Sequence, residues 1–125
     1  MNILVVSHEF PPIGGGGATA CRYLSGEFSR IGHSVTVVTS SYKDCKNEEM
    51  IDGAHIYRVR ALRKRKDTSA FHEMLSFVLS AYMHVDRLCK TGKFDVCLVF
   101  FGIPSGPIAM KMKRKYGISL NCILV

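Results

Sequence analysis

Residues 1–22, MNILVVSHEFPPIGGGGATACR, constrain the fold of this chain more than any other stretch. Ile3–Val6 is an uninterrupted apolar run, a pattern typical of a strand that is covered on both faces of a parallel sheet. Pro11–Pro12 lacks backbone N–H groups and has a fixed φ, so the strand must end near Ser7. Gly14–Gly17 then precedes a segment with helical spacing. The sequence therefore predicts a buried strand, a glycine loop and a helix, in that order.

The segment after the glycines has the spacing of an amphipathic helix. Apolar residues recur at steps of three and four over Ala18–Ile31, and Gly32 is placed as a C-cap glycine. The apolar face consists of Cys21, Leu24, Phe28 and Ile31. A helix that starts behind a buried strand leaves its first N–H groups and its positive dipole end at the carboxyl edge of the sheet. We therefore predict a site for a phosphate or carboxylate here, with a plain surface linker as the alternative. The residues of this predicted site are Gly14, Gly15, Gly16 and Gly17.

Two nucleotide-binding motifs do not fit this stretch. Gly15, Gly17 and Ala20 match a dinucleotide fingerprint by spacing, but the first glycine lies too far behind the strand. The second expected strand ends at Val38–Ser41, without the carboxylate that would hold a ribose. A phosphate-binding P-loop is excluded because neither Lys-Ser nor Lys-Thr follows the glycines. An oxidoreductase that uses a nicotinamide dinucleotide is therefore disfavoured.

The rest of the chain predicts an alternation of strands and helices. Apolar and β-branched runs predict strands over residues 33–40, 54–59, 94–101 and 118–125, with a polar loop over 41–50. Helices are expected over 69–90 and 105–116, with Ser69 and Ser105 as N-caps and Pro107 in the first turn. The first of these helices would bury Phe71, Leu75, Val78, Tyr82, Val85 and Cys89. The element order predicts an α/β fold, a Rossmann-like three-layer sandwich with a mainly parallel sheet.

Composition and charge indicate a single globular domain with anionic partners. The chain has 125 residues, 47% apolar and 22% charged, and a formal net charge of +7. Its densest basic run, Arg58–Lys66, is either a solvated connection or a patch for phosphates or anionic lipid. No aromatic residues interleave this run as a base-stacking platform would need, so we expect no nucleic-acid partner.

The cysteines show no metal-binding or disulfide pattern. There are five, an odd number without Cys-x-x-Cys spacing, which indicates neither a zinc site nor a disulfide framework. We therefore expect no metal and a reducing, cytoplasmic compartment. Met1-Asn2 leads directly into the first strand without a signal peptide, and charged residues and histidines interrupt the longest apolar segment, Phe71–Val85. We accordingly expect no membrane span.

The last residues, Asn121–Val125, end within an apolar run that no loop follows. A domain rarely ends in the middle of a buried strand. We therefore expect residues 1–125 to form an incomplete domain, truncated in its fifth strand.

Two segments carry a resemblance to a known family. The first runs from Ser7-His8-Glu9-Phe10-Pro11-Pro12 and the glycines to Gly32-His33-Ser34-Val35-Thr36-Val37-Val38-Thr39. The second is Phe101-Gly102-Ile103-Pro104-Ser105-Gly106-Pro107, after the fourth predicted strand. Together they resemble the N-terminal domain of GT-B glycosyltransferases of family 4, retaining enzymes that include sugar transferases to lipids and polysaccharides. The likeness covers essentially the whole chain.

The resemblance implies a two-domain enzyme. Residues 1–125 would form its Rossmann-like, acceptor-side N-terminal domain, and a C-terminal domain absent from this chain would hold most of a nucleotide-sugar. Gly14–Gly17 would lie against the donor diphosphate, and no cofactor is expected besides the nucleotide-sugar substrate. The acceptor would be a glycan or a lipid-linked precursor, which motivates a peripheral contact of the basic segments Arg58–Lys66 and Lys111–Lys115 with the anionic inner face of a membrane. The acceptor-side candidates are His8, Glu9, Phe101, Gly102, Ser105 and Gly106.

The resemblance places no catalytic residue in this chain. The histidine often found near the reacting sugar in the family follows the fifth strand, where this chain has ended. We expect structural or surface roles for the histidines at strand starts and on the long helix, which are His33, His55, His72 and His84. The chain alone should then be inactive. The alternative to a transferase is a non-catalytic α/β module that binds a phosphate or nucleotide.

Overall fold

The computed structural model describes residues 1–11, 16–41, 46–59, 71–100 and 102–123. Six strands and three helices are assigned within these residues. In chain order they are β1 (Asn2–Ser7), α1 (Gly16–Arg30), β2 (Ser34–Ser40), β3 (Glu48–Ile51), β4 (Ala54–Val59), α2 (Phe71–Thr91), β5 (Val96–Phe100), α3 (Gly102–Tyr116) and β6 (Ser119–Ile123).

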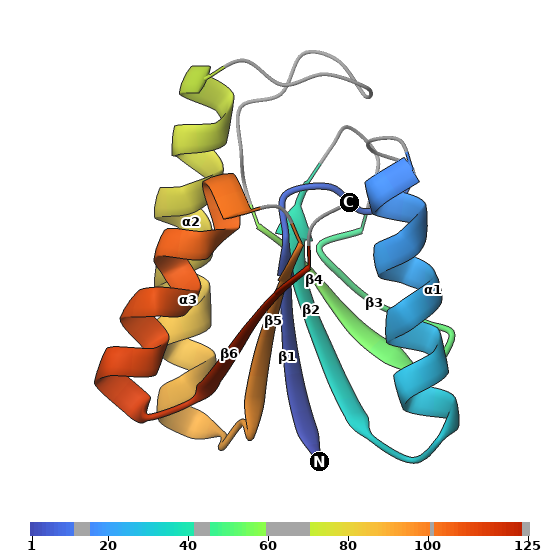
Figure 1. Cartoon of the computed structure of the whole chain (residues 1–125). Helices are drawn as coiled ribbons and strands as arrows, with labels where there is room; N and C mark the ends of the chain where they lie inside the picture. The colour runs from blue at the N-terminus through green and yellow to red at the C-terminus, as the bar shows by residue number, and fades with distance from the viewer. Residues whose placement is uncertain (12–15, 42–45, 60–70, 101, 124–125) are drawn as a thin grey trace.

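The strands form one sheet in the order β3-β4-β2-β1-β5-β6. All neighbours pair in parallel except β3, which is antiparallel to β4. Figure 1 shows α1 on one face of the sheet and α2 and α3 on the other. The predicted Rossmann-like three-layer sandwich with a mainly parallel sheet is therefore confirmed.

The centre of the sheet lies at β1, which pairs with β2 on one side and β5 on the other. Val5 is opposite Val37 and Leu98, and Leu4 and Val6 are fully buried. Leu4 and Val6 contribute to the core beneath α2 and α3, whereas Ile3 and Val5 contribute to the core beneath α1. An apolar run without alternation is what a strand covered on both faces requires, as the sequence predicted.

The three helices all begin at the same edge of the sheet, where the parallel strands end (Figure 1). This follows from right-handed crossovers, in which each helix runs back antiparallel to the strands it connects. Two helices end on a left-handed glycine: Gly32, the predicted C-cap, has a φ of 105°, and Gly117 has a φ of 69°. The carboxyl edge thus collects the helix N-termini, whose N–H groups lack intrahelical partners.

One predicted loop contains a strand. Residues 41–50 were expected to form a polar loop, but β3 occupies Glu48–Ile51 and pairs with β4 through a tight turn at Asp52 and Gly53. Both turn residues have positive φ, 51° and 84°, as a two-residue hairpin needs. β3 has two glutamates followed by Met50 and Ile51, so its four residues show no apolar alternation, which is why the sequence pattern missed it.

The helix boundaries and faces also differ from expectation. α1 begins at Gly16 rather than Ala18, and Ile31, predicted on its apolar face, lies beyond its end and is 62% exposed. On α2, Val85 is buried as predicted, and Val78, Tyr82 and Cys89 pack against the core. The prediction for Leu75 is wrong, since this residue is 50% exposed, and the buried Phe77 and Ala81 were missed.

The third helix and the last strand need similar corrections. α3 begins at Gly102, so Ser105 is not its N-cap and Pro107 lies inside the helix. The predicted strand at the end of the chain is β6, which pairs only with β5 among the described residues. It begins at Ser119 rather than at residue 118, and Ser119 and Asn121 are exposed within residues 1–125. The predicted N-cap Ser69 lies outside the described residues. Within the described part of the chain, no helix is long and apolar enough to cross a membrane.

Candidate functional site

The candidate site lies where β1 leads into α1. Gly16 and Gly17 form the first turn of α1, while Gly14 and Gly15 lie outside the described residues. A Cβ atom added to Gly16 would meet nothing within 4 Å, so the space beside this residue is open. The first N–H groups of a helix have no intrahelical acceptors and carry its positive dipole end. These N–H groups could bind an anion, so the anion site at the start of α1 stays a prediction.

Serines of two strands hold the backbone that leaves β1. Ser7 Oγ donates to the carbonyl of Glu9 at 2.6 Å, and Ser40 Oγ donates to the carbonyl of His8 at 2.8 Å. Ser40 is the last residue of β2, so the second bond ties the end of β2 to the turn after β1. This turn is fixed by side-chain hydrogen bonds in place of sheet pairing.

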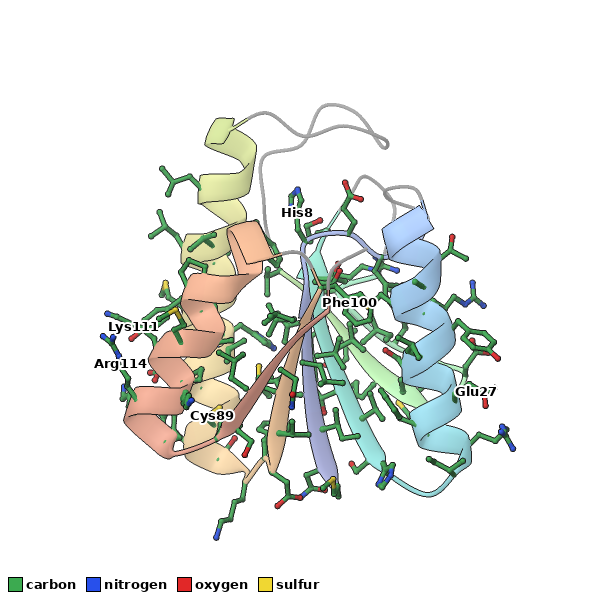
Figure 2. All side chains as sticks on the ribbon, viewed as in Figure 1. His8, Glu27, Cys89, Phe100, Lys111 and Arg114 are labelled. Atoms are coloured by element: carbon green, nitrogen blue, oxygen red, sulfur yellow. The ribbon has the colours of Figure 1, made fainter. Side chains whose placement is uncertain are left out.

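The two acceptor-side candidates on this turn have different surroundings. His8 is 3% exposed, and its ring centroid lies 5.2 Å from that of Phe77 on α2. Figure 2 shows His8 at the edge of the sheet where β1 ends. Glu9 is only partly buried. Of the two, Glu9 is thus more accessible to a ligand, and His8 is anchored against the α2 layer.

The other acceptor-side candidates follow β5. β5 neighbours β1, with Phe100 opposite Ser7, so the carboxyl ends of these two strands lie side by side. Gly102, Ser105 and Gly106 belong to α3, which makes this segment a helix start rather than a loop. Phe101 lies outside the described residues. The structure therefore brings the starts of α1 and α3 to one edge, on opposite faces of the sheet (Figure 1).

Arg58 is the residue of this edge that sequence reasoning placed wrongly. It was assigned to an exposed basic run, Arg58–Lys66, for contact with an anionic membrane. In the structure its side chain is 1% exposed at the carboxyl end of β4, on the α1 side of the sheet. Arg58 therefore cannot contribute to a membrane contact, and the rest of the run from residue 60 lies outside the described residues. The available signal was strand periodicity, since Ala54 and Ile56 precede Arg58 at steps of two on the same buried face.

The cysteines near the core are not nucleophiles. Burial raises the pKa of the Cys21 thiol, on α1, to about 12, and that of Cys97, on β5, also to about 12. A thiol with such a pKa is protonated at neutral pH and unreactive. Cys21, Cys89 and Cys97 are free cysteines. Across the described ranges, no group of three or more His, Cys, Asp or Glu residues could hold a metal ion.

The other histidines lie away from the starts of α1 and α3. His33 Nδ1 is 3.2 Å from the amino group of Met1, at the opposite edge of the sheet. His55 Nε2 lies 2.6 Å from Glu48 Oε1 and its ring stacks on Tyr57. His84 is half-buried on α2, where burial lowers its pKa. These contacts support the structural roles expected for the three residues. His72 is a residue of α2 whose side chain lies outside the description.

Comparison with protein families assigns the chain. The model of the glycosyl transferase 4-like domain matches residues 15–124, nearly the whole chain, including the start of α1 and the segment after β5. The chain belongs to this family. The match confirms the family that the sequence motifs resemble, and no curated protein sequence matches the chain.

Solved structures show how widely the fold of this glycosyl transferase 4-like domain is shared. Sucrose-phosphate synthase from Thermosynechococcus elongatus is 12% identical, with a TM-score of 0.75 over 99% of this chain and 32% of that one. MurG of Acinetobacter baumannii is 18% identical, with a TM-score of 0.57 over 98% of this chain and 34% of that one. The chain therefore spans about a third of each of these proteins.

A third similar structure has a different named activity. The C-terminal domain of a hydrogenase from Pyrococcus furiosus is 12% identical, with a TM-score of 0.67 over 97% of this chain and 89% of that one. Likeness at this level shows the fold alone, and one fold serves many functions. The functional assignment of this domain therefore rests on the family match and on the site.

Proposed function

We propose that this domain is the acceptor-side half of a glycosyltransferase. It would act in the transfer of a sugar from a nucleotide-sugar to a hydroxyl acceptor, such as a glycan or lipid-linked precursor, with retention of the anomeric configuration. A second domain, outside residues 1–125, would hold most of the donor. The observation that carries the proposal is the start of α1 at the carboxyl edge of β1, within the residues that match the family.

The chemistry of this position suits the leaving group of the reaction. When the sugar departs, negative charge develops on the diphosphate, and oriented N–H dipoles stabilise such charge without reorganising during the reaction. Gly16 and Gly17 would allow the diphosphate to approach the start of α1 closely, since neither carries a Cβ atom. The domain would thereby contribute electrostatic stabilisation from one side of a cleft. Cationic groups of the donor domain would supply the other side.

The acceptor would lie between the starts of α1 and α3. Glu9 is the accessible acidic residue on the turn after β1, and its carboxylate could accept a hydrogen bond from an acceptor hydroxyl. His8 stays an acceptor-side candidate, anchored on Phe77. Neither residue is proposed as catalytic, and the domain alone is expected to be inactive.

We also propose that the outer surface of α2 and α3 meets an anionic membrane, in place of Arg58. Leu75, Leu79 and Met83 of α2 are 50%, 62% and 64% exposed. Lys111 and Arg114 of α3 point away from the sheet (Figure 2). Within residues 75–91 and 107–116, Asp86 is the one acidic residue, and Lys90 and Lys115 bind it. An apolar stripe beside basic residues favours an anionic interface.

Vesicle co-sedimentation tests this surface. The domain should bind vesicles of phosphatidylcholine and phosphatidylglycerol more strongly than vesicles of phosphatidylcholine alone, and Lys111→Glu with Arg114→Glu should abolish the difference. Tyr23→Glu, on the exposed side of α1, is the matched control. Equal binding to both vesicle types would remove the electrostatic argument.

A transfer assay tests the main proposal. Two samples are compared: the protein encoded by the complete reading frame, and residues 1–125 alone. Each is incubated with a panel of nucleotide-sugars and hydroxyl acceptors, and release of the nucleoside diphosphate is measured. The protein encoded by the complete reading frame should consume one nucleotide-sugar and retain the anomeric configuration in the product. Residues 1–125 alone should consume none. Absence of transfer with every donor, together with nucleotide binding by residues 1–125 alone, would favour the non-catalytic binding module.

A further inference from the structure

Arg58 is a buried cation beside the candidate site. Arg58 as a whole residue is 5% exposed, and it lies two residues after Ile56, a core residue on the same face of β4. Removing a guanidinium from water is costly unless its charge is paired and its N–H groups are hydrogen-bonded. An apolar side chain at this position would avoid that penalty. The contacts that Arg58 makes should therefore show why an arginine is present.

Those contacts connect three segments of the chain. Arg58 Nη2 donates to the carbonyl of Pro11 at 2.8 Å and lies 3.5 Å from Glu49 Oε1 on β3. Its Cζ atom is 5.7 Å from the centroid of the Phe10 ring. Phe10 and Pro11 are the last described residues before the glycine segment. Arg58 thus binds the backbone that enters the site and packs on the ring next to it.

The rest of the guanidinium is poorly satisfied. Nε and Nη1 of Arg58 are buried and have no hydrogen-bond partner among the described residues. Thr39, its register partner on β2, has a buried Oγ1 atom in the same condition. A partly satisfied buried ion contributes little or nothing to stability compared with a hydrophobic residue of similar size. Stability therefore does not account for this arginine. Its hydrogen bond to the carbonyl of Pro11 indicates instead that it holds the backbone at Pro11.

We propose that Arg58 is a positioning residue for the candidate site. By binding the carbonyl of Pro11 and packing on the Phe10 ring, it would hold the backbone that leads to the first turn of α1. Pro11 itself cannot donate a hydrogen bond to the sheet, so its carbonyl is the group through which this part of the backbone can be held. The inference deepens the proposed function, because it concerns the same anion site.

Hydrogen exchange on the isolated chain tests the positioning role without any ligand. The amides of Ala20 and Cys21 are the first in α1 whose helical acceptors, the carbonyls of Gly16 and Gly17, belong to the opening turn. Arg58→Met should speed their exchange about tenfold or more relative to the amides of Val5 and Val37, which report global unfolding. The melting temperature should change little, because Glu49 is partly exposed and can be hydrated.

Two further variants make the result decisive. Arg22, on α1, forms an exposed ion pair with Asp52 in the turn between β3 and β4. Arg22→Met removes the same charge, and amide exchange in this variant should match that of the native chain. Arg58→Lys keeps one donor for Pro11 and should restore part of the protection; it also replaces Arg58→Met if that variant does not fold. Unchanged exchange at Ala20 and Cys21 in Arg58→Met, or equal acceleration in Arg22→Met, would overturn the positioning role.

A titration with inorganic pyrophosphate separates this inference from the proposed function. If pyrophosphate shifts the Gly16 and Gly17 amide signals of the native chain, Arg58→Met should weaken its binding about tenfold or more, which corresponds to about 1.4 kcal/mol. Equal affinity in the two chains would contradict the positioning role. If the native chain shows no shift, the anion site fails, while the exchange measurement still decides whether Arg58 fixes the start of α1.

Discussion

The two edges of the sheet differ in how their polar groups are used. At the amino edge, Asn2 donates from its backbone to Asp95 Oδ2 at 2.7 Å, and its carbonyl accepts from the backbone of Asp95 at 2.8 Å. Ser34 donates to the carbonyl of Met1 at 2.9 Å. At the carboxyl edge Ser7 and Ser40 also bind backbone carbonyls, but α1 begins with glycines, and two buried donors of Arg58 have no partner among the described residues. The carboxyl edge therefore differs in having the first N–H groups of α1, which lack intrahelical acceptors.

The difference shows where a parallel α/β domain can place a site. Right-handed crossovers bring all helix N-termini to the carboxyl edge, so free N–H groups and positive dipole ends gather there. At the amino edge, helix ends and strand starts can hydrogen-bond to one another, because no ligand has to bind there. Mutations at the amino edge should therefore change stability, and mutations at the carboxyl edge should change binding.

The largest expected effect is on the core that joins the two edges. Leu4 is fully buried in the central strand, and Leu4→Ala should lower the free energy of unfolding by about 2–5 kcal/mol, because a cavity adds to the lost burial. Urea denaturation measures it. Leu79→Ala, at a position that is 62% exposed, is the control and should stay within about 0.5 kcal/mol. A small loss for Leu4→Ala would contradict the assignment of the central strand.

The next largest effect should be a loss of pyrophosphate binding without a loss of stability. Gly16→Asp places a negative charge at the open start of α1, which should weaken pyrophosphate binding about tenfold or more, or about 1.4 kcal/mol. The same charge complements the helix dipole, so the free energy of unfolding should stay constant or rise by about 0.3–1 kcal/mol. Tyr23→Asp adds the charge to the exposed side of α1 and should leave binding unchanged. Calorimetric titration and thermal unfolding give the two quantities.

At the amino edge the expected pattern is the reverse. Asp95→Ala removes the carboxylate that binds the backbone N–H of Asn2, and should lower the free energy of unfolding by about 1 kcal/mol. Pyrophosphate affinity, measured by the same titration, should not change. A loss of affinity without a loss of stability would break the distinction between the edges.

The smallest effect concerns pH and a residue distant from both edges. Hydrogen bonds from Lys115 and Tyr116 lower the pKa of Asp86 from 3.8 to about 2. A carboxyl whose pKa is lowered by folding stabilises the protein above its unfolded pKa, and that contribution is lost as the pH falls from near 3.8 towards 2. Unfolding curves across this range should show the loss in the native chain, and Asp86→Asn should lack its share of it. Identical unfolding curves for the native chain and Asp86→Asn would contradict the lowered pKa of Asp86.

The sequence was sufficient for the fold where apolar patterns were unambiguous. The run Ile3–Val6 predicted the central strand, and glycines at 32 and 117 marked two helix ends. β3 was missed because its residues on an exposed edge carry no hydrophobic pattern. On α2 the prediction placed Val85 correctly but also buried Leu75, because apolar residues such as Leu75 and Leu79 continue the pattern on the exposed side.

The site could be predicted only in part. A glycine run between a strand and a helix indicated the start of α1, since that signal is local in sequence. Arg58 could not be found in the same way, because its partners Pro11 and Glu49 come from separate segments, and its neighbours in sequence are mostly basic. Charge clustering suggested an exposed patch, whereas strand periodicity places this one side chain in the core.

Binding of the donor diphosphate at the carboxyl edge can be followed in an NMR titration of the labelled chain with uridine diphosphate. The amide signals of Gly16, Gly17 and Ala18 should shift with increasing ligand, accompanied by those of His8 and Glu9, while those of Asn2 and Asp95 at the amino edge should not move. Absence of shifts at the start of α1, or shifts confined to the amino edge, would contradict the claim that the carboxyl edge binds the donor diphosphate.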